Sequence, residues 1–170
     1  MSKQIEQGGV NKHPSEAGAS QQSIAEQCAA KVLANDRVVA GFGIVLEDVA
    51  EGRAVMSMTV RPDMLNSQGR CHGGLLFTLA DAAFAFACVS CNQAGIGAHA
   101  AMDYIRGADE GDVLTATSVV RHRGNSASLV EVTVVNQLGK QVAFLHGRSH
   151  NFGRPFLDGG IGTVPDVVSK

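Results

Sequence analysis

Asp81 is the residue of this sequence whose type and surroundings most strongly suggest a chemical role. It is the only aspartate, glutamate, lysine or arginine between Arg70 and Asp103, and it lies within the apolar run from Gly73 to Val89. A carboxylate has low helix propensity, and burying it in apolar surroundings costs free energy. Burial also raises the pKa of a carboxyl group. Asp81 is therefore a candidate nucleophile or general base.

Two adjacent glycines, Gly73 and Gly74, stand where the loop 62–72 gives way to this apolar run. The first N–H groups of a helix lack intrahelical partners and, together with the helix dipole, can bind an anion or a developing oxyanion. Glycine would also let a substrate carbonyl approach the backbone closely. From spacing alone, an oxyanion site and a purely steric tight turn explain the pair about equally well.

Asp81 could act in two ways if it is partly desolvated. It could attack an acyl carbon directly, or it could deprotonate an attacking water. His72 is a conceivable base beside it, but Asp81 follows nine residues later, about two helical turns away, so we do not expect a direct pair. Asn66, which precedes this segment, suits a turn as well as a site, because asparagine readily forms Asx-turns.

The hydrophobic pattern predicts the elements that would position these residues. We predict helices at 23–34 and 73–92, and strands at 38–48, 54–61, 98–106, 112–121, 127–136 and 141–150. The second helix is apolar nearly all round, so it must be buried on several sides. An antiparallel sheet wrapped around this helix, an α+β fold, is the economical arrangement, and its edge strands would invite pairing between subunits.

Length and composition indicate one folded domain. The chain has 170 residues, is 45% hydrophobic and carries a net charge of −2, so it can form a core and has no global attraction to nucleic acid or anionic membrane. We see no signal peptide and no convincing membrane span, which favours a cytoplasmic protein. We predict a disordered lead at 1–20, the domain at 21–152 and a surface extension at 153–170.

The four cysteines do not indicate a metal or redox centre. Cys88 and Cys91 formally match a CxxC motif, but no second pair and no spaced histidines complete a zinc site. The pair also closes a predicted helix, whereas a thioredoxin-like motif opens one. We interpret both as small apolar side chains and expect no metal and no redox cofactor.

One long motif carries a family resemblance. The segment from Asn66 onward, NSQGRCHGGLLFTLADAAFAFA, closely resembles the hotdog-fold acyl-CoA thioesterases of the phenylacetic acid degradation (PaaI) type. That family has an Asn before a short loop, then His-Gly-Gly, then Leu-Ala-Asp on a central helix, and the likeness extends over residues 23–152. It implies the hotdog fold and hydrolysis of an acyl-CoA in phenylacetate catabolism. Phenylacetyl-CoA or hydroxyphenylacetyl-CoA is the first guess, with coenzyme A as part of the substrate.

The resemblance also implies roles for individual residues. Asp81 would be the nucleophile or general base, and the Gly73 N–H would polarise the thioester carbonyl. Asn66 would orient the attacking water or the carbonyl. His72 would be largely structural and would border the substrate together with Gly74.

The nucleotide end of coenzyme A would contact a basic turn. Arg121 and Arg123 are our candidates for its phosphates, often supplied by a neighbouring subunit in the resembled family. Related thioesterases often place a Ser or Thr from the partner chain near the carboxylate; here His99 occupies that position, so it would border the substrate with an altered role. The site would span a dimer interface, and dimers would pair into a homotetramer.

Other functions fit the sequence less well. Hotdog dehydratases and hydratases pair an acidic residue with a catalytic histidine, and the predicted helix carries no such pair. A non-catalytic acyl-CoA-binding protein could use the same tunnel but would not need Asp81. A purely structural oligomer module would leave Asn66, Gly73 and Asp81 unexplained together.

Overall fold

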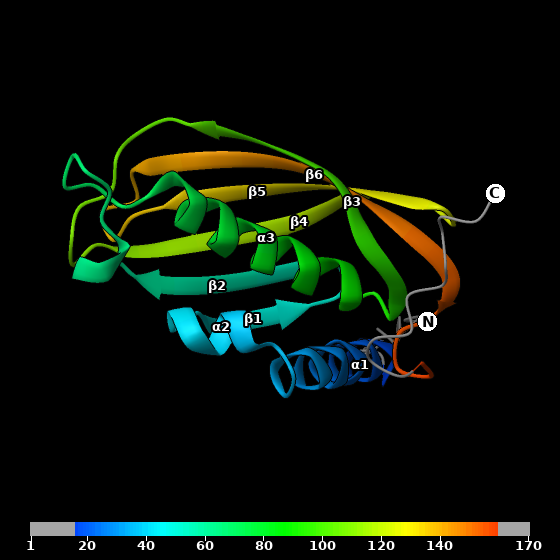
Figure 1. The fold of residues 1–170 in the computed structure, drawn as a ribbon. Coiled ribbons are helices and arrows are strands. Elements are labelled where there is room, and N and C mark those ends of the chain that lie inside the picture. The colour runs from blue at the N-terminus through cyan, green and yellow to red at the C-terminus, as the bar shows by residue number, and fades with distance from the viewer. Residues whose placement is uncertain (1–15, 160–170) are drawn as a thin grey trace, which may run out of the picture.

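The computed structural model describes residues 16–159, with side chains from residue 24 onward. In chain order the elements (Figure 1) are α1 (Glu16–Leu33), α2 (Arg37–Phe42), β1 (Val45–Ala50), β2 (Arg53–Thr59), the 3-10 turn η1 (Pro62–Met64), α3 (Gly73–Val89), β3 (Gln93–Tyr104), β4 (Val113–Arg123), β5 (Ala127–Val135) and β6 (Gln141–Pro155).

The strands form one six-stranded sheet in the order β1-β2-β4-β5-β6-β3, with every neighbouring pair antiparallel. The sheet curves around α3, which lies along its concave face (Figure 1). The predicted α+β architecture is confirmed. Since β3 pairs with β6 alone, one side of this long strand is an open edge.

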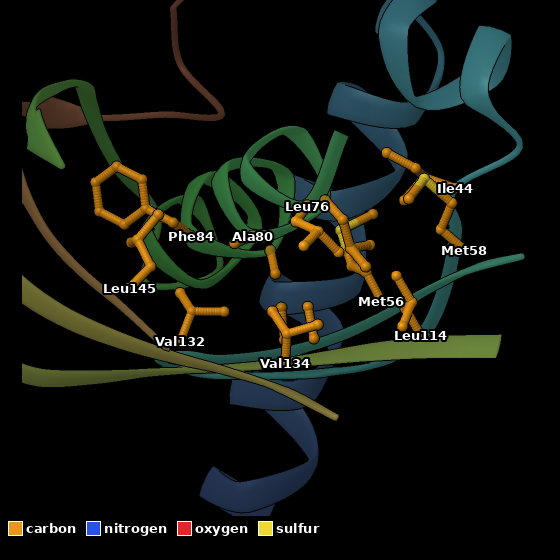
Figure 2. Close-up of a cluster of buried hydrophobic side chains, with 14 of the residues drawn as sticks. Ile44, Met56, Met58, Leu76, Ala80, Phe84, Leu114, Val132, Val134 and Leu145 are labelled. Carbon is orange, nitrogen blue, oxygen red and sulfur yellow. The ribbon is translucent and has the colours of Figure 1, made fainter. Parts of the chain in front are cut away.

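The core lies between α3 and the concave face of the sheet. Figure 2 shows part of this contact: Leu76, Ala80 and Phe84 on the helix, with Val132, Val134 and Leu145 on the strands. Alanines at 80, 83 and 87 are fully buried and let the helix axis lie close to the sheet. Burying each large apolar side chain here contributes about 1.5–3 kcal/mol. This packing fixes which face of α3 is turned away from the sheet.

The predicted strand at 38–48 is wrong in its first half. Residues Arg37–Phe42 form α2, because the side chain of Asp36 caps the helix by accepting two backbone N–H bonds of 3.0 Å. Gly43, at φ 66°, ends the helix in the left-handed conformation that glycine favours. Capping at both ends outweighs the β propensity of the valines, and the strand begins only at Val45.

The boundary between α3 and β3 also differs from the prediction. The helix ends at Val89 and not at 92, and β3 begins at Gln93 and not at 98. Gly95 falls between the predicted helix at 73–92 and the predicted strand at 98–106. It lies within the strand, where a Cβ would come within 2.6 Å of the His150 carbonyl oxygen. Close approach of two strands therefore explains this glycine.

The ends of the chain are only partly described. Helix α1 begins at Glu16, earlier than the predicted start at 23, and residues 1–15 of the predicted lead lie outside the described residues. Strand β6 runs on to Pro155, and residues 160–170 of the predicted extension also lie outside. The domain limits at 20 and 152 stay predictions. Within 16–159, no helix is long and apolar enough to cross a membrane.

Candidate active site

Asp81 lies on the face of α3 that the sheet does not cover. Gly74, Asp81 and Ala85 are exposed along this face, and Thr78 is half-buried between them. These residues recur at intervals of three and four, which places them in one stripe on the helix surface. The sequence predicted that this helix is buried on several sides. In the single chain the sheet buries one side of α3, and the stripe that carries Asp81 is left uncovered.

Asp81 opens onto a pocket of about 330 Å³ between α3 and the edge of the sheet. The pocket lies beside α3 residues Phe84, Ala85, Cys88 and Val89, β3 residues Gln93, Gly95, Ile96 and Gly97, and β6 residues Ser149 and Asn151. Asp81 is the one charged residue among these described lining residues. The pocket thus combines a single carboxylate with otherwise uncharged walls.

The pocket changes the acidity of the groups that face it. Asp81 is exposed to solvent on one side, but the surrounding pocket partly desolvates its carboxyl group and so raises its pKa above the ordinary value; the negative charge of Asp36 adds to this effect. Burial likewise raises the pKa of the Cys88 thiol to about 12, so this side chain is a neutral thiol near pH 7. A carboxylate with a raised pKa is a stronger base than an ordinary aspartate.

Gly73 is the first residue of α3, and its N–H finds no acceptor in the described part of the chain. Its carbonyl oxygen accepts a hydrogen bond of 3.2 Å from the Tyr104 hydroxyl. A Cβ at this position would lie 3.2 Å from the Tyr104 ring, so glycine is also favoured by packing. The free N–H at a helix N-terminus is a suitable donor for an oxyanion.

His72 is the N-cap of α3. Its Nδ1 atom accepts a hydrogen bond of 3.0 Å from the Gly74 N–H. This hydrogen bond caps the first turn of the helix; the expected structural role of His72 stays a prediction. In the described residues no hydrogen bond joins it to Asp81.

Asn66 shapes the loop before α3. Its Oδ1 atom accepts hydrogen bonds from the backbone N–H groups of Gln68, at 2.9 Å, and Arg70, at 3.2 Å. This is the Asx-turn that asparagine favours. Its Nδ2 group has no acceptor among the described contacts, so the donor end of the amide is available to a ligand.

The other expected substrate residues lie away from Asp81 in the single chain. His99 and Arg121 line a pocket of about 290 Å³, together with Glu131, that shares no residue with the Asp81 pocket. The Arg121 Nε atom lies 2.6 Å from a carboxylate oxygen of Glu131. One chain therefore does not bring His99 or Arg121 to the carboxylate.

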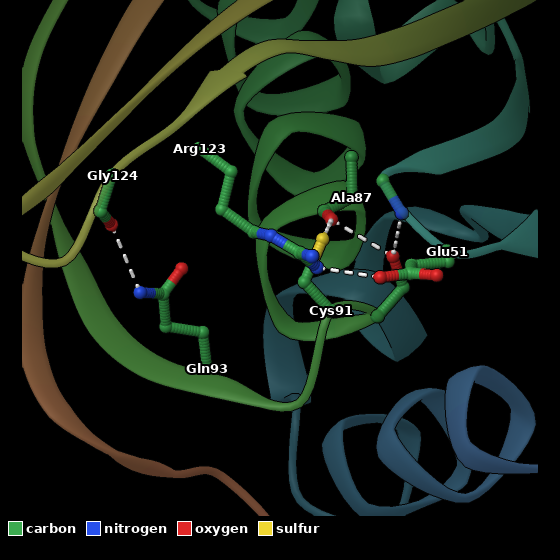
Figure 3. A network of polar contacts seen from close by, with 8 residues as sticks. Glu51, Ala87, Cys91, Gln93, Arg123 and Gly124 are labelled. Carbon is green, nitrogen blue, oxygen red and sulfur yellow. Dashed lines mark hydrogen bonds and ion pairs between the residues drawn. The ribbon is translucent and has the colours of Figure 1, made fainter. Parts of the chain in front are cut away.

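Arg123 lies in a third hollow, a polar cleft of about 790 Å³ beyond the C-terminal end of α3. Figure 3 shows its ion pair with Glu51, at 2.6 Å, and the hydrogen bond of 3.1 Å from Gln93 Nε2 to the Gly124 carbonyl. Cys91 also lines this cleft. Gln93 lines both the cleft and the Asp81 pocket, so the two hollows are neighbours.

The sequence did not single out three polar residues that line the Asp81 pocket, Gln93, Ser149 and Asn151. Ser149 and Asn151 lie on the same buried face of β6 as Leu145, in the alternating pattern of the strand, and they are 2% and 7% exposed. A polar residue in a buried alternating position is the signal that could have found them. Within the described residues, no group of three or more His, Cys, Asp or Glu side chains is placed to hold a metal.

Comparisons with known proteins show which family the chain belongs to. The model of the thioesterase superfamily matches residues 68–143, which include α3 and Asp81. Over 119 residues the chain is 44% identical to the acyl-coenzyme A thioesterase PaaI of Escherichia coli K12, covering 70% of this chain and 85% of that protein. The chain belongs to the thioesterase superfamily.

Solved structures of thioesterase superfamily members have the same architecture. The E. coli PaaI protein from the phenylacetic acid degradation operon matches with a TM-score of 0.78 at 41% identity, over 79% of this chain and 98% of that one. A hypothetical thioesterase from Streptococcus pneumoniae TIGR4, solved with coenzyme A, matches with a TM-score of 0.64 at 27% identity, over 66% and 90%. The predicted family, hotdog fold and enzyme class are confirmed.

Proposed function

We propose that this protein hydrolyses an acyl-CoA thioester to the free acid and coenzyme A, with Asp81 as the reacting carboxylate. The observation that carries the proposal is the position of Asp81, a lone charge whose pKa is raised, at a pocket of about 330 Å³. The E. coli relative, 44% identical, is named an acyl-coenzyme A thioesterase.

Two routes lead from this carboxylate to hydrolysis. Asp81 can add to the thioester carbon and expel the coenzyme A thiolate, leaving a mixed anhydride that water then opens. It can instead remove a proton from a water molecule that attacks the same carbon. Both routes require the ionised carboxylate and place negative charge on the carbonyl oxygen. Neither route uses a metal or a redox cofactor.

The oxyanion donor and the carboxylate would come from different subunits. Gly73 and Asp81 are eight residues apart on α3, which is about 12 Å along a helix that rises 1.5 Å per residue. An oxyanion donor must lie about 3 Å from the oxygen, and the attacking atom about 3–3.5 Å from the carbon. We therefore propose that Gly73 N–H and Asn66 Nδ2 of one copy face Asp81 of a second copy.

The surface of the chain supports such pairing. Strand β3 has an open edge, and its neighbourhood exposes Ile96, Tyr104 and Ile105. An exposed edge strand with apolar side chains readily pairs with another strand. The exposed stripe of α3 that carries Asp81 would be covered in the same contact. We propose a homodimer formed at these surfaces, and a homotetramer built from two such dimers.

The pocket favours an uncharged acyl group of modest size. Its volume lies at the lower end of the range of about 300–1,000 Å³ for small-molecule sites, and Asp81 would repel an anionic acyl group. A phenylacetyl or hydroxyphenylacetyl group meets both conditions. The E. coli relative comes from the phenylacetic acid degradation operon, which agrees with this choice.

Cationic side chains could hold the phosphates of coenzyme A. Arg121 and Arg123 are both exposed and each already pairs with a glutamate. Exposed ion pairs of this kind contribute only about 0–1 kcal/mol to stability, so a phosphate could replace the glutamate partner with little loss of free energy. His72, Gly74 and His99 would border the substrate in the assembled oligomer.

Thiol release from a panel of acyl-CoA esters tests the proposal. The wild type should hydrolyse at least one aryl-substituted ester, and Asp81→Asn should lower kcat/KM by about 10²–10⁴-fold. Asp109→Asn, which changes an exposed aspartate paired with Arg70, is the matched control and should keep full activity. Undiminished hydrolysis by Asp81→Asn would exclude the mechanism, and tight acyl-CoA binding without hydrolysis would indicate a non-catalytic acyl-CoA-binding protein.

A further inference from the structure

We propose that Phe84 is the residue that selects the size of the acyl group, and that Gly97 and Gly147 hold its ring away from the acyl pocket. The inference rests on the proposed function, because it takes the pocket beside Asp81 as the acyl pocket. It adds a specificity residue and the two positions that set its geometry.

Phe84 is placed to form one wall of this pocket. It follows Asp81 by three residues, almost one helical turn, and both residues line the same hollow. Phe84 is the one aromatic residue among the described lining residues and is only 3% exposed. The position of its ring therefore determines how much room an acyl group has next to the carboxylate.

The Phe84 ring lies against two glycines on neighbouring strands. A Cβ built at Gly147 on β6 would come within 2.9 Å of two ring atoms, Cδ2 and Cε2. A Cβ built at Gly97 on β3 would come within 3.2 Å of a third, Cε1. A side chain at Gly147 would force the Phe84 ring to shift, and one at Gly97 would press on the same ring. Because Phe84 forms a wall of the pocket, such a shift changes the room beside Asp81.

Backbone conformation does not account for these two glycines. Neither Gly97 nor Gly147 has the positive φ that favours glycine over other residues. Glycine in the interior of a strand weakens it and often marks a close approach. Here the approaching group is the Phe84 ring, so packing against this ring favours glycine at both sites, most strongly at Gly147.

A hydrogen-bonded polar network on β6 lines the pocket as well, next to Gly97, whose cross-strand partner is Ser149. Asn151 Nδ2 donates to the Gly124 carbonyl at 2.9 Å and to Ser128 Oγ at 3.1 Å, and Ser149 Oγ donates to Asn151 Oδ1 at 2.7 Å. These buried side chains satisfy one another and are fixed in place. The Phe84 ring is thus the wall whose position small substitutions can change.

The test compares kcat/KM for phenylacetyl-CoA and acetyl-CoA. Gly147→Ala should lower the phenylacetyl-to-acetyl ratio by about tenfold or more, since one methylene group in an apolar pocket changes selectivity about 10–200-fold. Gly147 does not itself line the Asp81 pocket, so its methyl group acts on the acyl group only by displacing the Phe84 ring. Phe84→Leu should shift the preference toward bulkier acyl groups. Gly41→Ala is the matched control: a Cβ there would meet nothing within 4 Å, so the ratio should not change.

A double variant separates an effect through the ring from general damage. Gly147→Ala combined with Phe84→Leu should recover the phenylacetyl-to-acetyl ratio, because the added methyl group then has no ring to displace. An unchanged ratio in folded Gly147→Ala, or no recovery in the double variant, would overturn the proposal while hydrolysis by the wild type still stands. Absence of hydrolysis of every ester by the wild type would instead overturn the proposed function and this inference with it.

Discussion

The Nδ1 atom of His72 accepts a hydrogen bond from the Gly74 N–H at 3.0 Å. A neutral histidine whose Nδ1 accepts in this way carries its proton on Nε2 and has no further lone pair to act as a base. The same bond anchors the first turn of α3, next to the unpaired N–H of Gly73. His72 therefore organises the end of the helix that we propose binds the oxyanion.

We expect His72→Asn to preserve both folding and hydrolysis, because asparagine is also a good N-cap. His72→Ala removes the cap and should lower the free energy of unfolding by about 1 kcal/mol. Thermal unfolding and thiol release from the two variants check this expectation. A folded His72→Asn variant with no activity would show that the imidazole takes part in the chemistry.

The Gly73 N–H can be removed with little change of backbone conformation. Proline suits the first position of a helix and lacks the N–H, and the extended conformation of His72, φ −62° and ψ 132°, suits a residue before proline. Gly73→Pro should lower kcat about 10²–10³-fold.

Gly73→Ala is the control, since it adds the same Cβ near Tyr104 but keeps the N–H. Equal activity of the two folded variants in the thiol-release assay would mean that this amide is not the oxyanion donor.

Mixing subunits tests whether the site is shared between copies. Asp81→Asn and Gly73→Pro should each be nearly inactive alone. If the two groups act across a dimer interface, half of the dimers formed by random mixing contain one subunit of each variant. Each of these dimers has one intact site and one doubly defective site, so about a quarter of wild-type activity should return. Thiol release after co-refolding equal amounts measures this. No recovery in confirmed mixed dimers would contradict a shared site.

Asp81 should make stability depend on pH in a definite direction. Because its pKa is raised in the folded chain, its contribution to stability is fully present below the unfolded pKa of about 3.9 and is lost as pH rises through the folded value. Asp81→Asn avoids this loss.

The difference in Tm between Asp81→Asn and the wild type should therefore grow from about pH 4 toward neutral pH, as thermal unfolding across that range would measure. A constant or shrinking difference would contradict the raised pKa. In the wild type, kcat/KM should rise with pH through the same raised value, because the reacting group is the ionised carboxylate.

Much of the fold could be predicted from local patterns. The alternating apolar residues of β4, β5 and β6 and the turns between them gave correct strands, since a hairpin is defined by neighbouring residues. Helix α2 was missed because its stability depends on Asp36 and Gly43 as caps, which outweigh the propensity of the residues between them.

The sequence by itself determined the family, the long helix within an antiparallel sheet and the unusual position of Asp81. These are properties of one segment and its spacing. Only the tertiary structure decided that Asp81 faces away from the sheet, that Phe84 rests on Gly97 and Gly147, and that His99 and Arg121 line a different hollow. Such relationships join residues far apart in the chain, and packing between elements, which no local pattern encodes, sets them.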